Sequence, residues 1–398
     1  MDVLYAYHDS LLHQISDSYY RYLFDEINWS QRMLAIKGPR GSGKTTLMLQ
    51  YIRYKLNKPR EEALYVTADH YWFYTHNLVE TADTFYKHGG RHLFIDEVHK
   101  YPGWSRELKN IYDGYPDMKI VFSSSSALDI YRGEADLSRR VITYTLPGLS
   151  FREYLSLEGH GTFSKYALSE IIGHHRDIAD QIRSQIHPMP SFKKYLRHGY
   201  LPIINESSPD DIPVRLNQII NTIIESDLAY IQDYGSGTAF KVKKLLGVLA
   251  ESTPFKPNIA AIARKLDVSR DSVYTWLHHL ENARLLNLLS AQGKGVAMLQ
   301  KPDKVYLENT NLAYALNPNP NIGSIRETFL FNQLVNAKSN VRLPKQGDFV
   351  IGDVTIEVGG SGKTNKQIKQ ISYAVIAADD IETGSGNKIP LWLFGFMY

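Results

Sequence analysis

Short apolar runs alternate with helical patterns over the first 150 residues. Each apolar run is four to six residues long, and together they occupy residues 33–36, 63–67, 92–96, 119–122 and 141–146. Helical periodicity follows the first run, from Thr45 to about Tyr54. Apolar strands separated by helices are typical of βαβ units, since parallel neighbours need a crossover connection. The pattern predicts an α/β fold built on a parallel sheet.

After residue 150 the strand pattern fades and helical periodicity replaces it. The segments 151–155, 192–196 and 216–220 predict helices of a helical lid subdomain. Further along, 259–266 and 270–282 predict two helices joined by a tight turn, with Ser269 as the N-cap of the second. The second helix directs four apolar side chains to a core: Val273, Trp276, Leu277 and Leu280.

Two apolar runs, 285–289 and 296–299, flank Gly293-Lys294-Gly295 and predict a strand, a wing and a strand. With the preceding helices they predict a winged helix-turn-helix, and a final α/β segment follows Pro302. The predicted domains are an α/β core (1–150), a helical lid (151–250), a winged-helix-like unit (251–301) and a C-terminal α/β domain (302–398).

Targeting and membrane signals are not found in this pattern. The first residues lack a basic segment followed by an apolar one, and no apolar run approaches the ~18 residues of a transmembrane helix. Near the end, Leu391–Tyr398 has a length that suits a buried strand. We expect a cytoplasmic protein with no membrane partner.

The amino-acid composition excludes several classes of binding and catalytic site. Lys and Arg number 45 and Asp and Glu 42, so a net charge of +3 excludes a strongly basic nucleic-acid binder but leaves room for a local basic face. The chain has no cysteine, which excludes disulfides, thiolate metal sites and cysteine nucleophiles. Carboxylates, hydroxyls, lysines and arginines remain as the reactive groups.

The segment from Gly38 to Thr45, GPRGSGKT, follows the first strand and opens a helix. Glycines let successive N–H groups curl around phosphate oxygens, and the helix N-terminus attracts the same anion. Lys44 would reach the β- and γ-phosphates of ATP, and the Thr45 hydroxyl would bind Mg²⁺. The residues predicted to contact the nucleotide are Gly38, Pro39, Arg40, Gly41, Ser42, Gly43, Lys44, Thr45 and Thr46.

The third strand ends in two carboxylates, Asp96 and Glu97. Asp96 would hold Mg²⁺ through water, and Glu97 would polarise the attacking water. Taken alone the pair could be a solvated strand end, but its place downstream of the phosphate loop favours a functional role. A glutamate at this position favours hydrolysis over transfer to a small acceptor.

Two further positions are weaker candidates. The fourth strand leads into four serines, of which Ser123, and after it Ser124, would orient the lytic water; the alternative is a serine-rich turn. Arg139 and Arg140 precede the fifth strand, and Arg140 would stabilise transition-state charge in its own site or in that of a neighbouring subunit of a homo-oligomer. The alternative is an exposed pair at a helix end.

These motifs resemble those of prokaryotic AAA-type P-loop ATPases that carry a C-terminal restriction-endonuclease-like domain. The resemblance rests on five segments in the expected order: GPRGSGKTT, LFIDEVHKYPGW, FSSSSALDIY, DLSRR and PGLSFREYL. Three positions depart from the family pattern, with Ser124 and Arg139 where glycines are usual and Gly148 where a proline is usual. The resemblance implies Mg²⁺-dependent ATP hydrolysis in an AAA-type core.

The winged-helix-like unit permits two interpretations. Its second helix could enter a DNA major groove, with contacts from Arg270, Ser272, Tyr274, Thr275, His278 and the wing residue Lys294. Asp271 and Glu281 lie on the same helix, so its face is only weakly basic, which disfavours strong DNA binding. The alternative is a module for protein contacts or for packing on the ATPase core.

Residues 347–358 predict a β-hairpin with Gly352-Asp353 as its turn. In that register Asp348 lies opposite Glu357, and two facing carboxylates suit a divalent metal better than a structural ion pair. Restriction-endonuclease-like folds place a lysine two residues after the glutamate, where this chain has Gly359; the nearest lysine is Lys363. Glu327 resembles the additional acidic residue of such folds. A degenerate nuclease-like binding module is favoured over an active nuclease or an unrelated hairpin.

The preferred function is Mg²⁺-dependent ATP binding and hydrolysis, coupled to conformational change that acts on DNA or on a protein partner. A second interpretation is a slow-turnover switch that binds ATP and controls a partner without a role on DNA. A third and weaker one is a nucleotide-gated nuclease.

Overall fold

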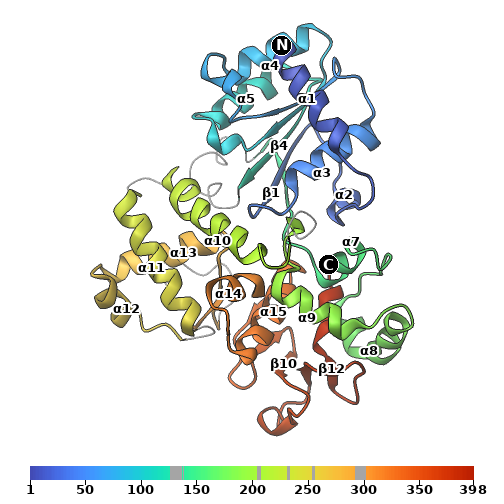
Figure 1. Ribbon diagram of the computed structural model, residues 1–398, viewed down its shortest axis with the longest axis vertical. Helices are drawn as coiled ribbons and strands as arrows, with labels where there is room; N and C mark the ends of the chain where they lie inside the picture. Colours follow the sequence, from blue (N-terminus) through green and yellow to red (C-terminus); the bar gives the residue numbers. More distant parts are fainter. Residues whose placement is uncertain (126–136, 138, 204–207, 231–233, 253–255, 292–301) are drawn as a thin grey trace. The chain divides into compact units, whose positions relative to one another are not determined.

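The computed structural model describes the chain except residues 126–136, 138, 204–207, 231–233, 253–255 and 292–301 (Figure 1). It divides into two compact units, Met1–Pro147 and Gly148–Tyr398. Each unit has its own five-stranded sheet.

The first unit is organised around a parallel sheet with the strand order β2-β3-β4-β1-β5. Its strands are β1 (Met33–Gly38), β2 (Ala63–Thr67), β3 (His92–Asp96), β4 (Lys119–Ser125) and β5 (Ile142–Thr145). All neighbouring pairs are parallel. The predicted parallel sheet is confirmed, and the five apolar runs form its strands. β4 continues three residues beyond the predicted run, which places Ser123 inside the strand.

Helices cover both faces of this sheet. They are α1 (Asp2–Gln14), α2 (Leu23–Glu26), α3 (Lys44–Gln50), which continues as a π-helix (Tyr51–Leu56), α4 (Leu78–Lys87) and α5 (Trp104–Gly114). Side chains alternate along β1, so that Met33 and Ala35 join the core under α4 and α5, whereas Leu34 and Ile36 join the core under α2 and α3. Burial on both faces explains why the strands read as continuous apolar runs.

The second unit begins with helices, as predicted. They are α7 (Phe151–Leu157), α8 (Leu168–Arg183), α9 (Pro188–His198), α10 (Ile212–Thr222) and α11 (Ser236–Ser252). A π-helical turn (Ile223–Asp227) and a 3-10 turn (Leu228–Tyr230) extend α10. The buried side chains Phe192 and Ile220 lie on the apolar faces that mark these helices in the sequence.

The two helices predicted for this unit are confirmed as α12 (Ile259–Leu266) and α13 (Arg270–Asn282). Ser269 caps α13 by accepting a hydrogen bond from the Ser272 N–H, 3.0 Å away. Its four predicted core residues, Val273, Trp276, Leu277 and Leu280, are buried.

The predicted wing is described only in part. β6 (Leu286–Leu289) pairs antiparallel with β7 (Lys304–Leu307), whereas the predicted partner 296–299 and Lys294 lie outside the described residues. The domain boundary expected after Lys301 therefore falls between two paired strands. β6 and β7 pair across this position, and the boundary stays a prediction.

The second sheet has the order β12-β11-β10-β9-β8. Its strands are β8 (Val341–Arg342), β9 (Phe349–Ile351), β10 (Val354–Gly359), β11 (Ala374–Ala378) and β12 (Lys388–Pro390), with α14 (Thr310–Leu316) and α15 (Ile322–Asn336) before them. β9 and β10 form the predicted hairpin, and Val354 opposite Ile351 gives the predicted register. β10, β11 and β12 are parallel.

The C-terminal apolar run is buried but is not a strand. Leu391–Phe396 forms a 3-10 helix in which Phe396 packs its ring against Phe151 and Phe163. Pro390 ends β12, and the large aromatic side chains fill space among helices. An apolar run of this length does not distinguish a strand from a buried helix, which explains the error.

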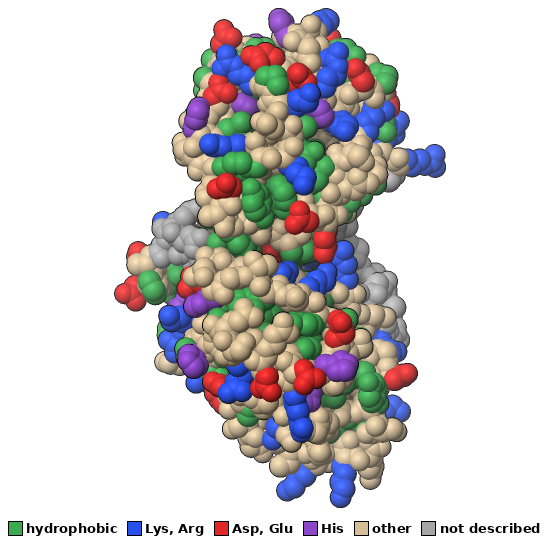
Figure 2. All heavy atoms as spheres, turned by 90° about the vertical axis from the view of Figure 1, so that its right-hand side faces the viewer, with side chains coloured by type: hydrophobic (Ala, Val, Ile, Leu, Met, Phe, Trp, Pro, Cys, Tyr) green, Lys and Arg blue, Asp and Glu red, His purple; other side chains and the backbone are tan. Residues whose placement is uncertain are grey.

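No helix in the described part of the chain is both long enough and apolar enough to cross a bilayer. The face shown in Figure 2 carries basic and acidic side chains interspersed, in keeping with the small net charge of +3.

Candidate functional site

The loop between β1 and α3 has the backbone that its glycines make possible. Gly41 and Gly43 adopt φ angles of +81° and +92°, which L side chains rarely reach. A Cβ on Gly38 would come within 2.2 Å of the Leu146 carbonyl oxygen. These glycines are therefore required by the local fold, and they leave the N–H groups of the loop and of α3 in the curled arrangement that suits an anion.

Lys44 turns back over this loop. Its Nζ donates hydrogen bonds to the carbonyl oxygens of Gly38, at 2.9 Å, and of Pro39, at 3.1 Å, and the side chain is buried. The ammonium thus spans the concave side of the loop. A phosphate placed there would offer it stronger, charge-assisted acceptors than neutral carbonyls.

Asp96 is the centre of the site. Its Oδ2 accepts hydrogen bonds from the Thr45 hydroxyl at 2.5 Å and the Tyr65 hydroxyl at 2.7 Å, and its Oδ1 accepts from Ser123 and from the Glu97 N–H. The carboxylate is buried at the end of β3. Oxygen ligands are those that Mg²⁺ prefers. The adjacent Thr45 and Asp96 oxygens fit one ion, which Thr45 would bind directly and Asp96 through water.

Tyr65 is a site residue that sequence reasoning missed. It lies in β2, which neighbours β3, and its hydroxyl reaches across to Asp96. Burial, and then the charge of Asp96, raise the pKa of Tyr65, so the phenol stays protonated and acts as a donor. A tyrosine in an otherwise apolar buried strand was the available signal.

Glu97 has an unusual backbone and a restrained side chain. Its φ is +50°, a conformation that is uncommon for a residue with a Cβ. The carboxylate pairs with Lys100, whose Nζ also lies 2.6 Å from the Asp69 carboxylate. Burial by itself would raise the pKa of Glu97, but the hydrogen bond and charge of Lys100 outweigh it and lower that pKa. In the described structure Glu97 is therefore ionised and held by a cation.

His99 was also missed. It is buried, its Nδ1 accepts a hydrogen bond from the Ser125 N–H at 3.3 Å, and its Nε2 meets no partner among the described residues. Burial, aided by Lys44, lowers the pKa of His99 to about 4, so the ring is neutral at pH 7. With Nδ1 accepting, Nε2 carries the proton and is a buried donor without an acceptor.

The two hydroxyl candidates are now distinguished. Ser123 lies beside Asp96, because β3 and β4 run in register, and its Oγ also accepts the Glu97 N–H at 3.1 Å. Ser124 is the next residue in the strand and points to the opposite face. Ser123 belongs to the Asp96 cluster, because its hydroxyl donates to the Asp96 carboxylate and accepts from the Glu97 backbone N–H.

Arg140 lies away from this cluster. It precedes β5, whose first residue, Ile142, pairs with Leu34 near the start of β1, whereas the phosphate loop follows the end of β1. Its guanidinium makes a two-point ion pair with Asp113, at 2.9 and 3.0 Å. The alternative in which Arg140 serves its own site is wrong, because parallel strands separate the two ends of the sheet. A role in a neighbouring subunit stays a prediction.

Arg21 is a third residue that the sequence did not reveal. It is buried, and its guanidinium donates to the carbonyl oxygen of Ser42 in the phosphate loop at 2.5 Å and to that of Pro147 at 2.9 Å. One side chain thus joins the phosphate loop to the segment that follows β5. Its position in an irregular stretch after α1 offered no pattern to detect.

The C-terminal carboxylates have a different environment from the one expected. Lys363 folds back over Gly359, where a Cβ would meet the lysine Cγ at 2.6 Å, and places Nζ 2.5 Å from Glu357. Lys304 places its Nζ 3.2 Å from Glu327 and 3.7 Å from Asp348. The hairpin itself supplies no basic neighbour to these carboxylates, but both lysines reach them from outside it.

These ion pairs change what the cluster offers a metal. Asp348 also accepts the Val358 N–H at 2.8 Å, and burial raises the pKa of Glu327 and of Glu357. Within the described residues, no group of three or more Asp, Glu or His side chains is placed to hold a metal ion. The geometry favours a structural ion-pair network over the predicted second metal site at Asp348 and Glu357.

The candidate DNA contacts of α13 face solvent only in part. Arg270 and Thr275 are exposed, Ser272 is bonded to Ser269, and His278 lies 3.6 Å from Glu281. Lys294 lies outside the described residues. Among these described candidates, Arg270 is the exposed cation that could contact a phosphate backbone. Both interpretations of this unit, DNA contact and a module for protein contacts or packing, therefore stay open.

Comparisons with known proteins bear on the first unit above all. Residues 30–155 match the family described as an AAA domain, and residues 189–322 match a domain of unknown function, DUF8612. The chain is 25% identical over 393 residues to an uncharacterized protein of Methanocaldococcus jannaschii, MJ1637, covering 91% of this chain and 82% of that protein. The AAA domain match covers the phosphate loop and the strand that ends at Asp96.

Two solved structures share low similarity with the chain. The Aeropyrum pernix ORC1 protein in complex with DNA is 13% identical, with a TM-score of 0.31, over 73% of this chain and 87% of that one. Caenorhabditis elegans PCH-2 is 16% identical, with a TM-score of 0.24, over 40% and 45%. Similarities of this size leave the family match and the site geometry as the basis for function.

Proposed function

We propose that this chain, whose residues 30–155 belong to the AAA domain family, binds ATP with Mg²⁺ and hydrolyses it at the loop Gly38–Thr45. The observation that carries the proposal is the convergence on Asp96 of hydroxyls from three other elements. The buried carboxylate is thereby fixed next to the phosphate loop. A solvated strand end would not need three hydroxyl donors, of which Tyr65 and Ser123 are buried.

On binding, Lys44 would exchange the carbonyls of Gly38 and Pro39 for oxygens of the β- and γ-phosphates. Thr45 and Asp96 would hold Mg²⁺, which supplies charge neutralisation for the phosphates. The loop N–H groups orient the phosphate chain. Arg40, within the loop, and Thr46, directly after it, complete the predicted nucleotide contacts.

Glu97 is the proposed residue that orients and polarises the attacking water. Its ionised state suits this role, but its pairing with Lys100 occupies the carboxylate. Productive chemistry would require Glu97 to move from Lys100 to the water. The buried Nε2–H of His99 provides a further donor, and we assign it to a γ-phosphate oxygen or to that water.

Arg21 supports a way of coupling occupancy to conformational change. A phosphate that tightens the loop would shift the Ser42 carbonyl and, through Arg21, the segment at Pro147 where the first unit ends. In this proposal the helical, winged-helix and C-terminal parts respond and act on DNA or on a protein partner. Arg140 would act from a neighbouring subunit of a homo-oligomer.

The ion pair between Glu97 and Lys100, which Asp69 also holds, favours one second candidate, a slow-turnover switch. If that pairing persists with nucleotide bound, ATP would bind tightly and hydrolyse slowly, and occupancy alone would control a partner. The C-terminal ion pairs give no comparable support to nuclease activity. We expect no DNA cleavage by the purified chain with Mg²⁺ or Mn²⁺.

Steady-state turnover and ATP affinity, measured with and without DNA while oligomer size is recorded, distinguish the two candidates. Turnover that DNA stimulates supports an ATPase acting on DNA. Tight binding with negligible turnover under every condition supports the switch. Absence of ATP binding would overturn both.

A further inference from the structure

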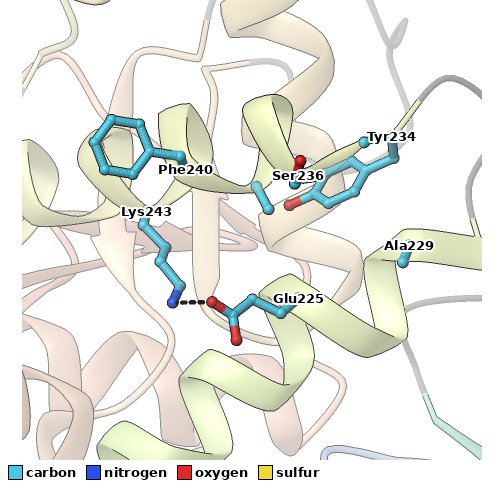
Figure 3. Close-up of a pocket in the computed structure, with 8 residues that line it drawn as sticks. Glu225, Ala229, Tyr234, Ser236, Phe240 and Lys243 are labelled. Carbon is cyan, nitrogen blue, oxygen red and sulfur yellow. Dashed lines mark hydrogen bonds and ion pairs between the residues drawn. The ribbon is translucent and has the colours of Figure 1, made fainter.

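A pocket of about 350 Å³ lies beside the first half of α11, within the segment that matches the domain of unknown function. Figure 3 shows its lining, which comes from α11 and from the helical turns that precede it. The lining includes Glu225, Ala229, Tyr234, Ser236, Phe240 and Lys243. Ser236, Phe240 and Lys243 are three or four residues apart, so they share one face of α11.

Tyr234 carries a buried hydroxyl that is not satisfied by the protein. The residue is 8% exposed, and its hydroxyl oxygen has no hydrogen-bond partner among the described residues. Burial, and then the charge of Glu225, raise the pKa of Tyr234, so the phenol stays protonated. An unpaired buried hydroxyl destabilises the fold, and a ligand with an acceptor would satisfy it.

The other donors of the pocket lie next to this phenol. α11 is 17 residues long and begins at Ser236, after Gly235, which has no side chain with which to cap it. The first N–H groups of a helix have no acceptor within the helix, and its N-terminus attracts negative charge. Figure 3 shows the Tyr234 ring directed toward Ser236, whose hydroxyl adds a further donor. This end of the pocket therefore suits an anionic group.

The rest of the lining decides the kind of anion. Lys243 is already 2.5 Å from Glu225, and no arginine is among the described lining residues, so little net positive charge is available for a phosphate dianion. The Phe240 ring is 60% exposed, and Ala229 and Ala239 add apolar surface. These features suit a monoanion with a flat apolar body.

We propose that this pocket binds a small aromatic carboxylate. Its carboxylate would accept hydrogen bonds from Tyr234, Ser236 and the first turn of α11, and its ring would lie against Phe240. The volume of about 350 Å³ is at the small end of ligand pockets and suits such a compound. This site does not depend on ATP binding or hydrolysis.

Phenylacetate is the probe, and calorimetric titration of the full chain is the measurement. Phenylacetamide tests the need for charge, because it has the same shape without it, and inorganic phosphate tests selectivity. Tyr234→Phe removes only the hydroxyl and should weaken phenylacetate binding at least about fivefold. Tyr74→Phe, at a tyrosine that is 84% exposed, is the matched control and should leave binding unchanged.

Thermal unfolding without ligand gives a second readout. Tyr234→Phe should leave the unfolding temperature unchanged or raise it, because it deletes a buried group that lacks a partner. Saturable binding of phenylacetate, weakened in Tyr234→Phe alone, supports the proposal. It is overturned if phenylacetate does not saturate by about 10 mM, if the amide or phosphate binds equally, or if Tyr234→Phe binds normally or unfolds at a lower temperature.

Discussion

Two sets of carboxylates near strand ends have opposite surroundings in this protein. Asp96, at the end of β3, receives hydrogen bonds from hydroxyls and a backbone N–H, all neutral donors. Glu357, in β10, is neutralised by Lys363. Neutral donors orient a carboxylate and leave its charge for a cation, whereas a lysine replaces the cation. The donors, more than the acids themselves, distinguish a candidate Mg²⁺ site from an ion-pair network.

The largest expected effect is at the phosphate loop. Lys44→Ala removes the cation that spans the loop and should weaken ATP binding and turnover about 100-fold or more. The thermal unfolding transition should change little, because Lys44 donates hydrogen bonds to carbonyls of its own loop. Fluorescent-nucleotide titration and phosphate release measure the two effects. Wild-type affinity in the variant would mean that the loop is not the nucleotide site.

At the C-terminal carboxylates the expected effect is on stability. Glu357 has a side chain that is only 3% exposed, so Lys363→Ala leaves a buried charge unpaired and should cost about 2 kcal/mol of unfolding free energy. Loss of the cation would raise the pKa of Glu357 further, so the deficit should shrink as pH falls and the carboxyl becomes neutral.

Adding Glu357→Gln to Lys363→Ala should restore most of that stability, because it removes the unpaired charge. Urea unfolding of the single and double variants at two pH values measures this coupling. A site built for a metal would behave differently, since Lys363→Ala would then increase affinity for Mn²⁺. Metal-stimulated DNA cleavage that Asp348→Ala abolishes would also contradict the ion-pair account.

Tyr65 tests the orienting role of neutral donors. Tyr65→Phe removes one hydrogen bond to Asp96 and should lower turnover about tenfold with a smaller change in ATP affinity. Tyr86→Phe is a matched control, because Tyr86 also donates to an aspartate, Asp117, but on the exposed surface. Equal losses in both variants would show that Tyr65 serves packing only.

Lys100 should give the smallest effect. Lys100→Met frees Glu97 from its cation and should raise basal turnover about two- to fivefold, since a partly buried ion pair no longer competes with the water. Lys87→Met, which breaks an exposed ion pair with Asp83, is the control and should have no effect.

The pH dependence of turnover gives a second test of Lys100→Met. Because Lys100 lowers the pKa of Glu97, wild-type turnover should fall only when pH drops through that lowered value. Without Lys100 the pKa rises, and the acidic limb of the rate profile should move to higher pH. If the acidic limb does not move, the ionisation of Glu97 does not control the rate-limiting step.

Local patterns predicted much of the fold. Strands buried on both faces read as apolar runs, and the hairpin register followed from a two-residue turn, so that Phe349 lies opposite Ile356 as expected. The phosphate loop was recognisable because glycines must occupy fixed positions in it.

What the sequence did not reveal depends on side chains that arrive from distant segments. Tyr65 reaches Asp96 across strand pairing, and Lys304 and Lys363 reach the hairpin from outside it. Arg140 lies at the end of the sheet opposite the phosphate loop, because β5 runs parallel to β1. The direction of a strand, and not distance along the sequence, decides which end of the sheet a residue occupies. The spacing of residues along the chain does not reveal which distant side chains come into contact in the fold.

The most direct test of the central claim is a single comparison of Glu97→Gln with the wild type, in which ATP binding and single-turnover hydrolysis are measured on the same sample with Mg²⁺. The account predicts ATP affinity within about threefold of wild type and hydrolysis slowed about 100-fold or more, since a neutral amide cannot polarise the attacking water. Unchanged hydrolysis in Glu97→Gln would contradict it.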